Sequence, residues 1–237
     1  MGFNDIGMHV RMKISQRPLD IIYMIDTSGS MYGDKIKTVN KAMHELETLL
    51  RKEAANNPSA QVNVRIITYG DDKGSWHLKE RTDVDKFKYQ DITYVNGSTP
   101  LGYALNMLNQ ALSKENMPER GLRPIVVLLS DGQPNDNWKN NLNKLNSLPW
   151  GDKAIRVAIA IGSDADKSVL AEFTRDPKLV LEANSVEELT NFIKWTSTLV
   201  SHVTQSHSER NNDGKIVAAE IHPPKTMQRA DDNEDFI

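Results

Sequence analysis

The sequence predicts an α/β fold: a doubly wound, Rossmann-like and mostly parallel sheet with one antiparallel edge strand and helices on both faces. Three stretches, 19–25, 125–129 and 154–161, are short and almost entirely apolar, as expected for strands that are covered on both sides. Patterns with helical spacing alternate with these stretches along the chain. Such alternation is typical of parallel sheets built from strand–helix–strand units.

The first part of the chain predicts a strand, a helix and a hairpin. After the strand at 19–25, apolar residues recur with helical spacing up to a breaker sequence at 56–59. The apolar positions of this helix are Ile36, Val39, Met43, Leu46 and Leu50. Residues 62–69 predict the second strand, and 75–81 predict a short edge strand that pairs with it as a hairpin. Residues 82–93 indicate neither a helix nor a strand.

The second part of the chain continues the alternation. We expect, in order, a helix that opens near Pro100, a strand at 125–129, a helix at 138–148, a strand at 154–161, a helix at 166–173, a short strand at 179–181 and a last helix. The last helix is expected to begin at Ser185, because Ser185 and Glu188 have the spacing of a capping box. Its apolar stripe continues to Val203, with Thr196 in the same register.

The composition limits the class of protein. The 237 residues suffice for one α/β domain, and we predict an N-terminal extension at 1–17, the domain at 18–205 and a flexible polar and acidic tail at 206–237. The chain has no cysteine, which excludes disulfides, thiolate metal sites and cysteine nucleophiles. A net charge of −3 gives no reason to expect nucleic acid or an anionic membrane as a partner. The sequence shows no secretory signal and no apolar segment long enough to cross a membrane, and we therefore expect a cytoplasmic protein.

Oxygen-bearing side chains gather where three predicted elements meet one edge of the sheet. Asp26, Ser28 and Ser30 follow the first strand, Thr99 precedes a helix, and Asp131 follows a central strand. In open α/β sheets, ligands bind at the C-terminal ends of the strands. A set of carboxylates and hydroxyls without imidazole or thiol suits a small hard cation and does not suit zinc.

The spacing Asp26-x-Ser28-x-Ser30, with a distant threonine and a distant aspartate, resembles the metal-ion-dependent adhesion site of von Willebrand factor A (vWA) domains and integrin inserted domains. The resemblance covers the whole predicted globular part, and among family members the cysteine-free chain looks most like bacterial TerY-type proteins of tellurite resistance and stress response. It implies the vWA fold. It also implies that Ser28, Ser30 and Thr99 supply hydroxyl ligands, while Asp26 and Asp131 act directly or through water.

The same resemblance implies a function. The cation would be Mg²⁺, with Mn²⁺ or Ca²⁺ as alternatives, and one open coordination position would take a glutamate or aspartate of a partner protein. The chain would then be a metal-dependent protein-binding module, without catalytic residues, in a bacterial stress or tellurite-resistance signalling complex. A kinase or phosphatase encoded nearby is a further expected partner by resemblance to TerY-type proteins.

Other interpretations of these residues remain open. A serine or aspartate at the end of a strand commonly caps the next helix. Gln133, Asn135, Asp136 and Asn137 are expected at the rim of the site, where they either select the partner or only cap the helix at Trp138. Tyr32 and Tyr103 are similar cases.

Two rival functions also stay open. The first is a Mg²⁺-dependent phosphohydrolase of the aspartyl-phosphate type. Ser28 stands where such an enzyme usually has its acid/base carboxylate, and no lysine lies beside Thr99 or Asp131 in the sequence. The second rival is a scaffolding domain with a vestigial site. The usable oxygen ligands at all five positions argue against it.

Overall fold

The computed structural model describes residues 16–131, 133–163, 165–208 and 221–224. Nearly all of the predicted N-terminal extension and most of the predicted tail, with its acidic run, lie outside these residues. The division of the chain into extension, domain and tail therefore stays a prediction.

Six strands form one sheet in the order β3-β2-β1-β4-β5-β6. The strands are β1 (Arg17–Asp26), β2 (Ala60–Gly70), β3 (Lys73–Asp83), β4 (Ile125–Ser130), β5 (Ile155–Ile161) and β6 (Val180–Ala183). All neighbours pair in parallel except β2 and β3, which form an antiparallel hairpin at the edge. The predicted fold class is thereby confirmed.

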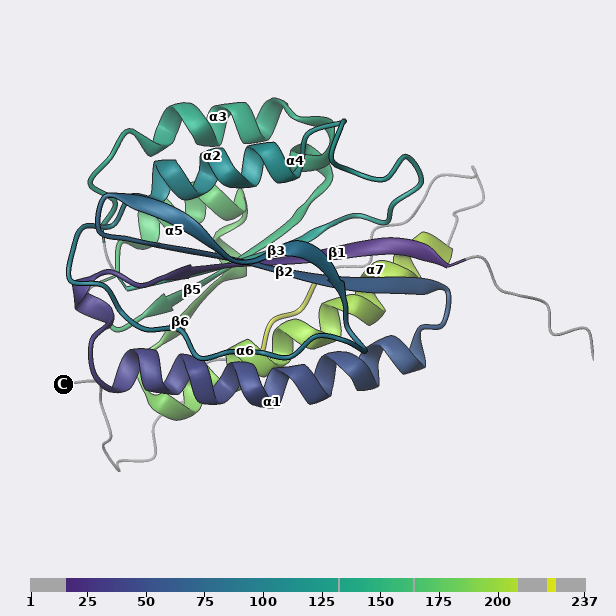
Figure 1. Cartoon of the computed structure of the whole chain (residues 1–237), viewed down its shortest axis with the longest axis horizontal. Helices are drawn as coiled ribbons and strands as arrows, with labels where there is room; N and C mark the ends of the chain where they lie inside the picture. The colour runs from purple at the N-terminus through teal and green to yellow at the C-terminus, as the bar shows by residue number, and fades with distance from the viewer. Residues whose placement is uncertain (1–15, 132, 164, 209–220, 225–237) are drawn as a thin grey trace, which may run out of the picture.

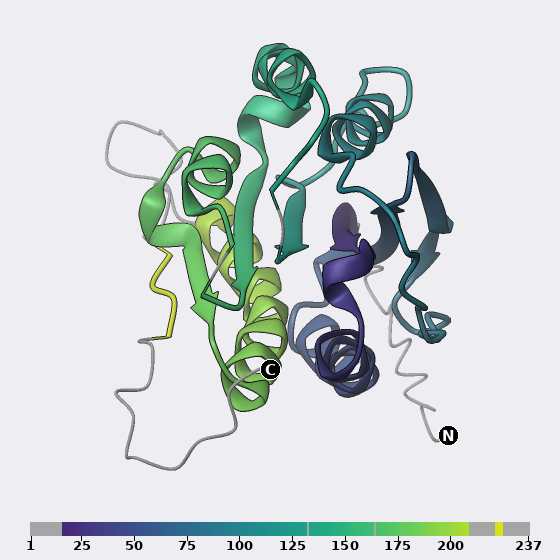
Figure 2. The ribbon, with the colours of Figure 1, turned by 90° about the vertical axis from the view of Figure 1, so that its left-hand side faces the viewer.

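Helices cover both faces of the sheet. One face carries α1 (Asp34–Asn56), α6 (Val186–Trp195) and α7 (Leu199–Ser208), and the other carries α2 (Leu101–Ala111), α3 (Trp138–Ser147), α4 (Pro149–Lys153) and α5 (Lys167–Thr174) (Figures 1 and 2). The five apolar positions predicted for the first helix are all buried in α1. The short helix α4, which begins at Pro149, was not predicted.

The sheet separates two apolar cores. Because successive residues of a strand point to opposite faces, Tyr23 packs with α1, α6 and α7, whereas Ile22 and Met24 pack with α2, α3 and α5. This two-sided burial explains why the sequence of β1 is apolar at nearly every position and does not alternate.

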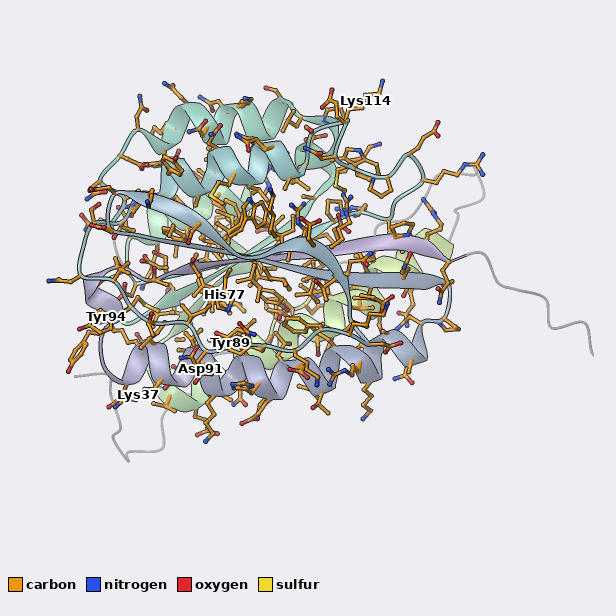
Figure 3. All side chains as sticks on the ribbon, in the orientation of Figure 1. Lys37, His77, Tyr89, Asp91, Tyr94 and Lys114 are labelled. Atoms are coloured by element: carbon orange, nitrogen blue, oxygen red, sulfur yellow. The ribbon has the colours of Figure 1, made fainter. Side chains whose placement is uncertain are left out.

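Residues 84–100 form no helix and no strand, and they run along α1 towards the end of the sheet. The side chain of Asn40 on α1 holds this segment. Its Oδ1 accepts hydrogen bonds from the Tyr89 hydroxyl (2.7 Å) and the Ile92 N–H (2.9 Å), and its Nδ2 donates to the Ile92 carbonyl (2.9 Å); Tyr89 is labelled in Figure 3. The segment is therefore held by individual side-chain hydrogen bonds. It lacks the hydrophobic periodicity from which a helix or a strand can be predicted.

The last predicted helix is divided in two by a 3₁₀ segment, η3 (Thr196–Thr198). The expectation of one helix running to Val203 was wrong. The three hydroxyls of η3 each donate to the carbonyl three residues earlier, at 2.6–2.8 Å. Side-chain bonds of this kind compete with the helical ladder, and they accompany the tighter turn here.

The start of α6 is as predicted. The Ser185 hydroxyl accepts the N–H of Glu188 at 3.2 Å. The Glu188 carboxylate closes the box on the N–H of Asn184, one residue earlier than the capping box expects, at 2.9 Å.

Candidate metal centre

The ends of β1 and β4 lie together at one edge of the sheet, because the two strands are adjacent and parallel. Asp26 is the last residue of β1, and Asp131 follows directly after β4. The short 3₁₀ helix η1 (Gly29–Met31) then turns the chain towards α1, and it carries Ser30 over this edge, at the left-hand end of the sheet in Figure 1.

A chain of hydrogen bonds joins the two carboxylates. Asp26 Oδ1 accepts the backbone N–H of Ser28 at 2.9 Å, and the Ser28 hydroxyl lies 3.1 Å from the Ser30 hydroxyl. The Ser30 hydroxyl donates to Asp131 Oδ1 at 2.8 Å. Alternate residues of the first loop thus face the same place, as their spacing predicts.

Thr99 is held beside this group through its backbone. The Thr99 carbonyl accepts the N–H of Asn135 at 3.3 Å, which ties it to the loop after β4. Two residues earlier, the Gly97 carbonyl accepts the N–H of Gly29 at 3.3 Å, which ties the same segment to the first loop. Thr99 itself is buried, with 7% of the residue exposed. The structure therefore brings all five predicted residues to one region.

The electrostatics of the group favour a bound cation. Asp26 has no solvent exposure, and burial raises its pKa from 3.8 to about 6, although hydrogen bonds from Ser28 and Ser130 act in the opposite direction. The negative charge of Asp131 raises the pKa of Asp26 further. A positive ion at this place would offset the cost of keeping both buried carboxylates charged. The donors are hard oxygens, so the residues present fit a divalent cation that prefers oxygen ligands.

A sequence model of the von Willebrand factor type A domain matches residues 20–195. The chain belongs to this family. This chain is 29% identical over 129 residues to inter-alpha-trypsin inhibitor heavy chain H3 of Pongo abelii, covering 50% of this chain and 14% of the relative. It is 25% identical over an alignment of 272 residues to heavy chain H2 of Mesocricetus auratus, covering 93% of this chain and 28% of the relative. The chain thus spans a minor part of the length of these relatives.

Solved structures share the fold. Proximal thread matrix protein 1 from the mussel byssus, with a zinc-occupied metal-ion-dependent adhesion site, superposes with a TM-score of 0.56 at 20% identity, over 79% of this chain and 46% of that one. The open conformation of the pilus adhesin SpaC from Lactobacillus rhamnosus GG superposes with a TM-score of 0.59 at 15% identity, over 78% and 30% of the two chains. At these identities the likeness of the vWA domain to both proteins shows the fold alone.

Two residues of the vWA domain that the predicted set omits also contact its carboxylates. Ser130, the last residue of β4, donates its hydroxyl to Asp26 Oδ2 at 2.8 Å. Lys35, in the first turn of α1, donates its ammonium to Asp131 Oδ2 at 2.8 Å. No lysine adjoins Asp131 in the sequence, as stated above. In the folded chain, however, Lys35 lies beside it, so the inference that no lysine is near Asp131 was wrong. Ser130 adjoins the Asp131 motif and could have been found from it, whereas no local signal in the sequence marks Lys35.

The predicted rim residues have different positions. Asp136 caps a helix, but the helix is α2 and not the expected one at Trp138, because its carboxylate accepts the N–H groups of Gly102 (2.9 Å) and Tyr103 (3.1 Å). Gln133, Asn135 and Asn137 are exposed. They stay candidates for partner selection.

Large exposed apolar side chains gather around the site. Within the described residues these are Tyr32 (67% exposed), Tyr94 (39%), Val95 (40%) and Tyr103 (49%), and we call them the apolar rim. Tyr32 follows η1, Tyr94 and Val95 precede the Thr99 loop, and Tyr103 lies in the first turn of α2. The rings of Tyr32 and Tyr94 meet edge to face with centroids 4.8 Å apart, and Figure 3 shows Tyr94 at the site end of the molecule.

The described part of the chain offers no cluster of three or more His, Cys, Asp or Glu side chains that could hold a metal ion. A metal site built on acidic and imidazole groups alone is therefore not seen there, and the set at the sheet edge depends on its hydroxyls. Among the described residues, none of the helices combines the length and the apolar character that crossing a bilayer requires.

Proposed function

We propose that this vWA domain is a metal-dependent protein-binding module. Asp26, Ser28, Ser30, Thr99 and Asp131 hold one divalent cation, and the cation takes a glutamate or aspartate side chain of a partner protein. The observation that carries the proposal is the hydrogen-bonded chain from Asp26 through Ser28 and Ser30 to Asp131, at the sheet edge where Thr99 also lies.

The donor set supports Mg²⁺ as the metal. Mg²⁺ prefers about six oxygen ligands and keeps some of its water, so a set of few protein oxygens leaves a position for another molecule's carboxylate. Mn²⁺ and Ca²⁺ accept the same donors. Zinc is reported in the mussel protein, and it belongs in the same titrations.

The apolar rim supports binding of a protein rather than of a free ion or a small acid. Exposed aromatic side chains are enriched at protein interfaces, where they bury much area at little entropic cost. The rim therefore predicts a partner whose acidic residue is flanked by apolar side chains.

The cellular setting rests on the resemblance to TerY-type proteins. A bacterial stress or tellurite-resistance complex, a cytoplasmic location and a kinase or phosphatase partner all stay predictions of that resemblance. The relatives reported above are inter-alpha-trypsin inhibitor heavy chains, and they add no support for this setting.

The phosphohydrolase alternative is favoured by one observation. Lys35 places an ammonium beside Asp131, where it could neutralise a phosphate. Against it, Ser28 stands where the acid/base carboxylate of such an enzyme is expected. Incubation of the Mg²⁺-loaded protein with a generic phosphate ester separates the two functions, and we expect no phosphate release.

Calorimetric titration with MgCl₂ and MnCl₂ tests the proposed function. We expect one site per chain in the wild type and no measurable site in Asp131→Ala, because that variant loses one of the two anionic ligands. The matched control is Asp34→Ala, whose carboxylate is exposed and pairs only with Lys37 among the described residues.

Capture of partners with and without EDTA extends this test to binding. Chelation and Asp131→Ala should remove the same partner, while circular dichroism shows that the variant stays folded. A wild-type protein that binds none of these cations would overturn the proposal.

A further inference from the structure

Lys35 differs from the other lysine of the same helix end. Its ammonium lies 2.8 Å from Asp131 Oδ2, with 15% of the lysine side chain and none of the aspartate side chain exposed. Lys37, two residues later, pairs with Asp34 at 3.2 Å, and both of those side chains are more than three-quarters exposed. The first ion pair is thus part of the site, whereas the second lies in water and contributes little.

The charges of the site do not balance when Lys35 is counted. Asp26 and Asp131 together carry two negative charges, which a divalent cation neutralises. The ammonium of Lys35 then adds one positive charge in a poorly solvated place, where charges interact more strongly than in water.

The other carboxylates near the site do not cancel the positive charge of Lys35. Asp136 accepts two N–H groups at the N-terminus of α2, whose positive end it offsets. Asp34 and Asp71 are exposed, so that solvent and salt screen them.

We propose that Lys35 is the residue that makes the site prefer an acidic ligand. With a divalent cation bound, Lys35 leaves the site with one unbalanced positive charge, and the partner's carboxylate neutralises it. The same charge repels the metal, so the site gives up metal affinity for selectivity towards an anion. The inference rests on the proposed function and adds to it the residue that sets the charge of the ligand.

This arrangement predicts two opposite effects of one substitution. Lys35→Met should tighten Mn²⁺ binding by about tenfold, because it removes a repelling charge and frees Asp131. The same variant should weaken binding of a carboxylate to the Mn²⁺-loaded site by about tenfold, because the loaded site becomes neutral. A variant that lost its fold or its local order would instead bind both Mn²⁺ and the carboxylate more weakly.

The experiment uses the full chain and two measurements. Calorimetry with MnCl₂ gives the metal affinity, and water-proton relaxation of the Mn²⁺-loaded protein, titrated with acetate at constant ionic strength, gives the carboxylate affinity. Lys35→Arg keeps the charge and should leave both affinities near those of the wild type. Lys37→Met is the matched control and should change neither.

The outcomes separate this inference from the proposed function. If Lys35→Met weakens Mn²⁺ binding, the lysine only positions Asp131 and the inference is wrong. The inference is also wrong if Lys35→Met leaves acetate binding unchanged. If the wild type itself binds no Mn²⁺, the proposed function fails, and the lysine variants are not needed to show it.

Discussion

Asp26 is a carboxylate that the fold places out of water at the end of a central strand. Two donors, the Ser28 N–H and the Ser130 hydroxyl, each satisfy one of its oxygens, yet burial still raises its pKa to about 6. Its charged form is therefore costly in the metal-free protein. A cation at the site would offset that cost, and this supports the proposed metal binding.

The raised pKa of Asp26 predicts how the stability of the chelated protein changes with pH. The folded state keeps the proton up to about pH 6, whereas the unfolded chain loses it near 3.8. The folded state binds more protons between these values, so this contribution to stability is complete below pH 3.8 and is lost as the pH rises through about 6.

Asp26→Asn should remove this dependence. At pH 7 in EDTA we expect the variant to unfold with a free energy up to about 3 kcal/mol above that of the wild type, since the amide carries no charge to bury. With Mn²⁺ bound, the wild type should be more stable than Asp26→Asn. Urea unfolding at pH 4 to 7, with EDTA and with Mn²⁺, measures both, and a variant less stable than the wild type in EDTA at pH 7 would contradict the argument.

Among the elements, the junction between α6 and α7 shows how a few hydroxyls change a helix. The Thr196 hydroxyl donates to the Ile193 carbonyl at 2.6 Å and lies 3.0 Å from the Tyr23 hydroxyl of β1. Because the one proton of the threonine is used, the tyrosine donates to the threonine. The 3₁₀ segment is thereby joined to the centre of the sheet.

Thr196→Val should cost about 1–3 kcal/mol of unfolding free energy, because it leaves the buried Tyr23 hydroxyl without this partner. Tyr23→Phe should cost less, since Thr196 keeps its bond to Ile193. In urea denaturation, we expect the double variant to lose less unfolding free energy than the sum of the losses of the two single variants. Strictly additive effects would show that the hydrogen bond contributes nothing.

At the scale of the whole protein, the sheet places every feature of the proposed site at the C-terminal ends of its parallel strands. The hydrogen-bonded carboxylates, Lys35 and the apolar rim all lie where β1 and β4 end, whereas the opposite ends of the strands carry none of them. This concentration is the general property of open α/β sheets, in which ligands bind beyond the C-terminal ends of the strands.

The apolar rim should matter for binding and not for folding. We expect Tyr32→Ser/Tyr94→Ser to leave Mn²⁺ affinity unchanged and the domain folded, with stability lowered by about 1–2 kcal/mol because the edge-to-face contact of the two rings is lost. Capture of the EDTA-sensitive partner should fall at least about tenfold, as expected when aromatic contacts of an interface are lost. Unchanged capture would mean that the metal alone binds the partner.

The fold class could be predicted from the sequence, and so could four of the central elements, the three strands among them to within two residues at each end. Apolar periodicity is a local property, so β1, α1, β4 and β5 can be predicted without knowledge of their neighbours. The five oxygen side chains also follow from the sequence, because parallel strands bring their C-terminal ends to a common edge. Their role as metal ligands stays a prediction.

The other groups that reach this end of the sheet depend on the three-dimensional fold. Lys35 and Asp131 lie 96 residues apart, and they meet because β1 and β4 are neighbours and α1 begins beside them. Residues 84–100 follow α1 through contacts with Asn40, and so bring Tyr94 to the site without any repeating pattern. The charge and the apolar rim of the site therefore depend on long-range contacts, which have no local signal in the sequence.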